Sequence, residues 1–251
     1  MSDRQTLIAV VGLQFEARIA DGICTRVVCR GDGPSLAASL ARAITKGCHG
    51  LISLGVAGGL SPDLPPGACV IGSEILCGTT RLMTDRNWSQ NLLQVIPDSI
   101  YGKIVGVADP IAYPEAKRAL YQNTGAVAVD MESHVVASVA AANGLPFIAI
   151  RIITDPAKRV LPKVALAAMR PNGTINFAAM LRSLMKHPDD LGLLIQTARD
   201  AFAALATLSR VCAMFEFGDR YIPKLPQSPS SIFGRRRATA SLIKAKLGSS
   251  R

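Results

Sequence analysis

The sequence predicts an α/β protein with three layers, in which helices cover both faces of a central mixed, mostly parallel sheet. Apolar runs of strand length alternate along the chain with stretches in which apolar residues recur at helical spacing. Several of the strand-like runs are apolar at nearly every position, which is typical of strands buried on both faces. The chain of 251 residues is long enough for one sizeable core. A chain of this length buries roughly 70–75% of the surface that it exposes when unfolded.

The predicted strands are short apolar runs bounded by Gly, Pro or charged residues. They cover residues 6–12, 22–30, 50–55, 68–77, 103–108, 126–130 and 146–155. Between the third and the fourth of these runs, residues 56–67 contain Ala-Gly-Gly followed by three prolines. This composition predicts a loop.

The predicted helices cover residues 36–46, 114–123, 131–143, 174–186 and 190–215. Gly47 is placed to end the first of them, and Pro114 stands at the first position of the second. The last two have apolar residues at helical spacing. We therefore predict one α/β domain over residues 1–219.

Residues 220–251 differ from the rest of the chain in charge. They contain eight Lys or Arg and no Asp or Glu, whereas residues 1–219 hold 20 basic and 18 acidic side chains. Together with the run PKLPQSPSS, this composition predicts a basic, flexible tail. Three interpretations stay open, namely a solvated tail without a role, peripheral contact with an anionic membrane, and nucleic-acid binding. No aromatic interleaving or binding motif supports nucleic acid, which we do not expect as a partner.

Several classes of protein are excluded by what the chain lacks. Its most apolar stretch, residues 135–150, is broken by Asn143, Gly144 and Pro146 and is shorter than the ~20 residues of a membrane span. The apolar run at residues 7–13 is too short for a signal peptide. The six cysteines form no CxxC pair and no metal-binding spacing with the three histidines. We expect a cytoplasmic protein without a metal site.

Two buried-looking strands end in acidic residues. Asp130 and Glu132 follow the run at 126–130, and Asp155 ends the run at 146–155. Ligands of open α/β sheets bind at the carboxyl ends of strands, so these carboxylates are candidates for a binding crevice. Structural roles remain open as well, because Asp130 can cap the following helix, Glu132 can complement its dipole and Asp155 can cap the turn at Pro156.

Three motifs carry a resemblance to a known family. VAVDMES (127–133), FIAIRIITDPA (147–157) and ISLGVAGGLSPDLPPG (52–67) together resemble the nucleoside phosphorylase family that includes the methylthioadenosine/S-adenosylhomocysteine nucleosidases. FEAR (15–18) and DMESH (130–134) are most similar to its hopanoid-associated phosphorylase subgroup. The resemblance implies an enzyme that removes adenine from adenosylhopane.

The resemblance assigns roles to residues already singled out. Asp155 is implied as the acid that protonates N7 of the purine, so that adenine leaves as a neutral molecule. Glu132 is implied to hold the ribose hydroxyls and Met131 to pack on the sugar. The implied purine pocket contains Ala57, Gly58 and Asp109, with Ile111 or Tyr113 in place of a stacking aromatic residue.

The nucleophile implied by the family is water or phosphate. Glu16 in the first loop is the candidate activator of water, and Arg18 is the candidate substitute for a phosphate-binding arginine. Arg30, Gly31 and Gly33 stand before a helix, where backbone N–H groups can cradle an anion. Phosphate is thus a possible co-substrate, no other cofactor is expected, and hydrolysis and phosphorolysis both stay open.

The favoured function is therefore cleavage of the N-glycosidic bond of adenosylhopane by a homo-oligomeric enzyme. We expect this enzyme in the cytoplasm, with peripheral contact to the inner membrane face left open. Two alternatives remain. One is a soluble methylthioadenosine-type nucleosidase or purine nucleoside phosphorylase. The other is a nucleoside-binding protein without catalysis.

Overall fold

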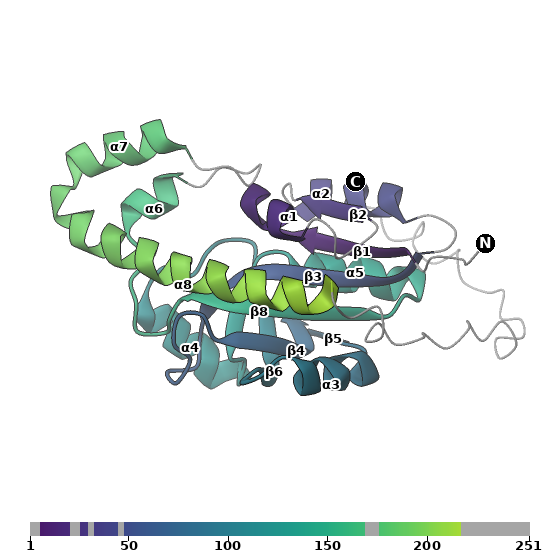
Figure 1. Ribbon diagram of the computed structural model, residues 1–251. Coiled ribbons are helices and arrows are strands. Elements are labelled where there is room, and N and C mark those ends of the chain that lie inside the picture. The colour runs from purple at the N-terminus through teal and green to yellow at the C-terminus, as the bar shows by residue number, and fades with distance from the viewer. Residues whose placement is uncertain (1–5, 21–25, 30–32, 45–47, 169–175, 217–251) are drawn as a thin grey trace, which may run out of the picture.

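The structure is a computed structural model that describes residues 6–20, 26–29, 33–44, 48–168 and 176–216 (Figure 1). Within these ranges, eight strands form one mixed sheet that is surrounded by helices. The predicted α/β class with a mostly parallel, mixed sheet is confirmed. The basic tail at 220–251 and the first part of the predicted strand at 22–30 lie outside the described residues, so the domain boundary stays a prediction.

The centre of the sheet is the long strand β3. One edge of β3 pairs with β8 in parallel, and its other edge pairs with β1 in parallel and, at Gly58 and Gly59, with β7 in the antiparallel sense. Strand β6 pairs with β7 and β4, and β4 pairs with β8, so five strands close on themselves. The strands are β1 (Thr6–Val11), β2 (Arg26–Cys29), β3 (Cys48–Gly59), β4 (Cys69–Cys77), β5 (Thr80–Met83), β6 (Ile100–Gly106), β7 (Ala128–Asp130) and β8 (Phe147–Asp155).

Helices pack on both faces of this sheet because successive side chains of a strand point to opposite faces. In β1, Ile8 and Val10 join one buried cluster with helices α2 and α5, and Leu7 and Val11 join another with α1, α3 and α8. The helices are α1 (Gln14–Ala20), α2 (Gly33–Ala43), α3 (Arg86–Val95), α4 (Pro114–Thr124), α5 (Ser133–Asn143), α6 (Lys163–Ala168), α7 (Phe177–Lys186) and α8 (Leu191–Glu216), with a 3-10 turn at Pro188–Asp190.

Some sequence-based boundaries were wrong. Residues 56–59, predicted as the start of a loop, continue β3, because β7 and β8 supply backbone partners on both edges. Residues 14–20, predicted as loop, form the short helix α1. Helix α5 begins at Ser133 instead of residue 131, so Met131 and Glu132 lie in the link between strand and helix. The prediction also missed β5, α3 and α6, of which β5 and α6 are only four and six residues long.

Helix α8 runs along β8, whereas α7 and the start of α8 extend beyond the end of the sheet (Figure 1). The segment Pro188–Met214 is long and apolar enough to cross a membrane by length and composition, with a mean hydropathy of 1.2 over its most apolar window, of which 11% is buried. Core helices of globular proteins meet the same criterion. Since α8 packs on β8 with Ala204, Leu208 and Val211 in the core, the finding does not indicate a membrane-spanning protein.

Candidate active site

A cavity of about 340 Å³ lies at the carboxyl ends of β3 and β8. Register explains why two acidic strand ends meet there. Gly58 of β3 pairs with Val129 on one edge and with Asp155 on the other, which brings the ends of β7 and β8 together. Helices α7 and α8 form a mostly apolar wall of this cavity, which is lined by Met180, Leu194, Ala198, Ala201 and Leu205 together with Thr197.

Four carboxylates line this cavity, and three of them, Glu132, Glu16 and Asp155, lie beside glycines. A Cβ on Gly12 would come within 3.0 Å of the Glu132 carboxylate, and one on Gly55 within 2.8 Å of Glu16. A Cβ on Gly58 would lie 3.3 Å from both carboxylate oxygens of Asp155. A side chain at Gly55 would collide with the Glu16 carboxylate, and side chains at Gly12 and Gly58 would crowd those of Glu132 and Asp155.

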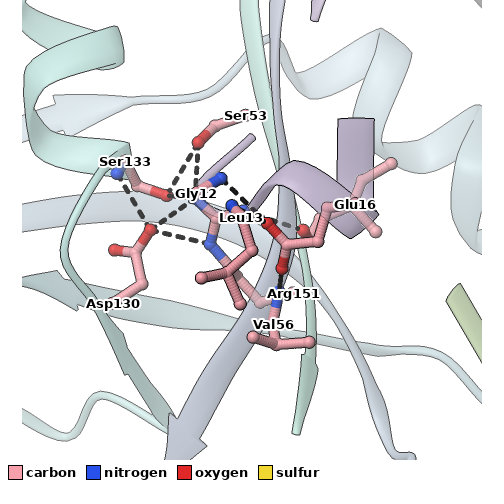
Figure 2. Close-up of polar contacts among 9 residues, drawn as sticks. Gly12, Leu13, Glu16, Ser53, Val56, Asp130, Ser133 and Arg151 are labelled. Carbon is pink, nitrogen blue, oxygen red and sulfur yellow. Dashed lines mark hydrogen bonds and ion pairs between the residues drawn. The ribbon is translucent and has the colours of Figure 1, made fainter. Parts of the chain in front are cut away.

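Glu16 is held by backbone donors (Figure 2). Its Oε2 accepts hydrogen bonds from the N–H groups of Gly12 (2.8 Å) and Leu13 (2.7 Å), and its Oε1 accepts one from Val56 (2.8 Å). The residue is only 1% exposed. Burial raises the pKa of the Glu16 carboxyl above its ordinary value, and the three N–H groups and the charge of Arg151 oppose this rise. A carboxylate with a raised pKa is a stronger base than an exposed glutamate.

A buried ion pair lies behind the cavity. Arg151 of β8 donates through Nε to Asp130 Oδ2 at 2.7 Å, and both side chains are 1% exposed. The guanidinium also donates to the hydroxyls of Ser53 (2.6 Å) and Ser133 (3.0 Å). Asp130 Oδ2 in turn accepts the N–H of Ser133, the first residue of α5, at 2.9 Å, but the N-cap of this helix is Glu132 and not Asp130 as anticipated. Figure 2 shows this network beside Glu16.

Asp155 has a buried cation as its partner. Lys117 of α4 has no exposed surface, and its Nζ lies 2.6 Å from Asp155 Oδ2. The other oxygen, Oδ1, lies 3.3 Å from the hydroxyl of Thr154. Burial raises the pKa of the Asp155 carboxyl above its ordinary value, and the ion pair and hydrogen bond with Lys117 limit this rise.

The structure brings only some of the predicted site residues together. Those that line the cavity are Glu16, Ala57, Gly58, Ile111, Met131, Glu132 and Asp155. Arg18, Asp109 and Tyr113 are exposed and Gly33 begins α2, and none of these four is among the lining residues. Arg30 and Gly31 lie outside the described residues. The roles assigned to all of these residues stay predictions.

Sequence reasoning missed Arg151 and Lys117. Arg151 stands inside an otherwise apolar strand, where a charge needs a partner, and that was a usable signal. Lys117 gave none, because a lysine in a helix with polar neighbours looks like a solvated side chain. Only the packing of α4 against the end of β8 shows that it is buried.

Comparisons with known proteins identify a family and support the α/β fold. The family model of the Phosphorylase superfamily matches residues 14–186. A comparison with curated protein sequences finds no match.

Solved structures share the fold at low sequence identity. The Campylobacter jejuni 5′-methylthioadenosine/S-adenosylhomocysteine nucleosidase superposes with a TM-score of 0.59 at 15% identity, over 85% of this chain and 99% of that one. A mutant of the Helicobacter pylori nucleosidase with 5′-methylthioadenosine in its active site gives 0.54 at 16% identity, over 72% and 98%. Futalosine hydrolase of Helicobacter pylori gives 0.53 at 16% identity, over 82% and 99%.

We predict that Arg151→Met lowers the free energy of unfolding by about 3–5 kcal/mol, because it leaves Asp130 buried without its cation. The double variant Arg151→Met/Asp130→Leu leaves no buried charge and should recover part of this loss. Urea unfolding of both variants measures the difference, with the exposed Arg42→Met as control, expected within about 0.5 kcal/mol of the parent. Equal stability of single and double variants would show that the ion pair is not what holds these elements.

Proposed function

The chain belongs to the phosphorylase superfamily, and we propose that it hydrolyses the N-glycosidic bond of an adenine nucleoside with a large apolar substituent, adenosylhopane being the favoured substrate. Membership of this superfamily makes the chain an enzyme of the nucleoside phosphorylase or nucleosidase type. One observation supports the proposed hydrolysis of a nucleoside with a large apolar substituent. Glu16, Glu132 and Asp155 line a single cavity that also has a mostly apolar wall.

Asp155 is the proposed general acid. Its buried carboxyl has a raised pKa and therefore retains a proton to higher pH than an exposed aspartate. Transfer of that proton to N7 of the purine lets adenine leave as a neutral molecule, and such help is typically worth ~10²–10⁴-fold in rate. Glu132 is proposed to accept hydrogen bonds from the ribose hydroxyls, with Met131 packed on the sugar.

Glu16 is the proposed base that activates water. The cavity lining favours water over phosphate. Among the described residues that line it there is no Lys or Arg, whereas Glu16 and Glu132 are acidic and would repel a phosphate dianion. The predicted anion cradle at Arg30 and Gly31 is outside the described residues, so the experiment below includes phosphate as a variable.

The apolar wall supports a substrate with a large apolar group. The side chains of Met180, Leu194 and Leu205 offer no hydrogen-bond partners to a polar substituent. Helix α8 continues this apolar surface outward, because Leu191, Ile195 and Phe202 are 47–72% exposed and lie on one stripe. A soluble methylthioadenosine-type nucleosidase is the alternative, supported by the fold shared with such enzymes.

The decisive experiment is incubation of the enzyme with adenosylhopane, with and without phosphate, followed by mass analysis of the sugar product. We expect free adenine and an unphosphorylated ribosyl product in both cases. Asp155→Asn should release adenine ~10²-fold more slowly with its fold intact, because the amide cannot supply the proton. Turnover of 5′-methylthioadenosine but not of adenosylhopane would favour the alternative, and unchanged turnover by the variant would remove Asp155 from the mechanism.

We predict that Glu132→Gln narrows the preference of the enzyme for adenosine over 2′-deoxyadenosine by about tenfold or more. A buried group that is placed to bind a hydroxyl penalises a substrate without it. The ratio of the two kcat/KM values is the measurement. An unchanged ratio would mean that Glu132 does not hold the ribose.

We further propose that the enzyme is cytoplasmic and meets its substrate at the inner membrane face through the basic residues at 220–251. Each Lys or Arg close to an anionic surface contributes about 1 kcal/mol, and salt screens this attraction. Removal of residues 222–251 deletes seven of the eight basic residues. We expect weaker co-sedimentation with anionic vesicles at low salt and unchanged turnover of adenosine. Equal vesicle binding by both proteins would contradict a role of this segment at the membrane.

A further inference from the structure

Helix α4 is a surface helix whose one buried residue is a lysine. Its neighbours Glu115, Ala116 and Arg118 are exposed, whereas Lys117 has no exposed surface. Packing alone would be served by a leucine or methionine at this position, without the cost of removing an ammonium group from water. The contacts of the ammonium group should therefore explain why a charged residue occupies this position.

All contacts of the ammonium group lie at the end of β8. Besides Asp155 Oδ2 at 2.6 Å, Nζ lies within hydrogen-bond distance of the backbone carbonyls of Asp155 (3.2 Å), Pro156 (3.1 Å) and Arg159 (3.2 Å). Lys117 thus fixes both the carboxylate and the loop that follows it. The same loop is tied to the cavity wall, since the Arg159 guanidinium lies 3.0 Å from the Asp200 carboxylate of α8.

We propose that Lys117 is a positioning residue for the general acid, which holds Asp155 Oδ2 so that Oδ1 serves the nucleobase and neutralises the carboxylate left after proton transfer. This inference rests on the proposed function. The proton moves from Asp155 to N7 of the purine, the C–N bond breaks with its electrons going to adenine, and Asp155 becomes an anion. The ammonium of Lys117 keeps its own protons and compensates that anion in a buried site.

Lys117 is the charged neighbour that lowers the pKa of the Asp155 carboxyl against the effect of burial. Within the described residues, Lys117 is the charged side chain that acts on the Asp155 carboxyl, and the hydroxyl of Thr154 is its other side-chain partner. Arg159 and Asp200 lie next along the loop and wall and neutralise each other. Loss of the ammonium would raise the pKa of Asp155 further, because burial would then be opposed only weakly.

The test compares two leaving groups in Lys117→Met, which keeps an unbranched side chain that is one atom shorter and removes its charge. Adenine must be protonated to leave, whereas p-nitrophenolate of p-nitrophenyl riboside leaves as an anion without a proton. We expect the ratio of kcat for adenosine to kcat for p-nitrophenyl riboside to fall about tenfold or more. The pH at which adenosine turnover falls should rise by about one unit, since Asp155 must be protonated and would lose its proton at higher pH.

Matched variants separate this role from a structural one. Lys117→Arg keeps the charge and should restore most of the ratio, and the exposed neighbour Arg118→Met should leave both ratio and pH profile at parental values. If the role of Lys117 were only structural, its replacement would lower kcat for both substrates by the same factor. Should Lys117→Met fail to fold, Lys117→Gln removes the charge while keeping an N–H donor, and the same outcomes decide.

An unchanged ratio and pH profile in a folded neutral variant would overturn the inference while leaving the proposed function intact. If the parent enzyme released no adenine from either adenosine or adenosylhopane, the proposed function itself would fail, which is a different result.

Discussion

The ion pair between Arg151 and Asp130 is the interaction on which the arrangement of the site depends. It joins β8 to the end of β7 in a region that water does not reach, where a single unpaired charge would be costly. The guanidinium also binds Ser53 of β3 and Ser133 of α5, so one side chain connects four elements. The link that carries Met131 and Glu132 starts and ends at residues of this network, and its path to the cavity follows from it.

The acidic residues around the cavity differ in what compensates them. Asp130 has a guanidinium, Asp155 an ammonium and Glu16 three backbone N–H groups. One site can hold both an acid and a base when its carboxyl groups have different surroundings. The closed arrangement of β3, β8, β4, β6 and β7 keeps these surroundings rigid, because no edge of the ring is free to shift in register.

The apolar wall of the cavity and its carboxylates come from different parts of the chain. Asp130, Glu132 and Asp155 come from strand ends and the link next to them and Glu16 comes from α1, whereas the wall comes from α7 and α8 near the end of the described chain. The wall and the carboxylates come from separate elements, so one can change between proteins of this fold without the other. The neighbouring structures, which act on different nucleosides according to their names, share this fold at 15–16% identity.

The sequence by itself determined the α/β class, the mostly parallel sheet and the position of acids at the ends of two strands. Those features depend on local periodicity and on which residues end each apolar run, and both are visible in a single chain. It also carried the family, through three motifs in order. Tertiary structure decided which charges pair. Asp130 turned out to face Arg151 and to accept the N–H of Ser133, and Lys117 turned out to be buried against Asp155, because β3 aligns β7 and β8 at Gly58 and α4 packs beside their ends. Pairing between residues 21 and 38 positions apart has no period along the sequence, so only the register of the strands and the packing of the helix could reveal it.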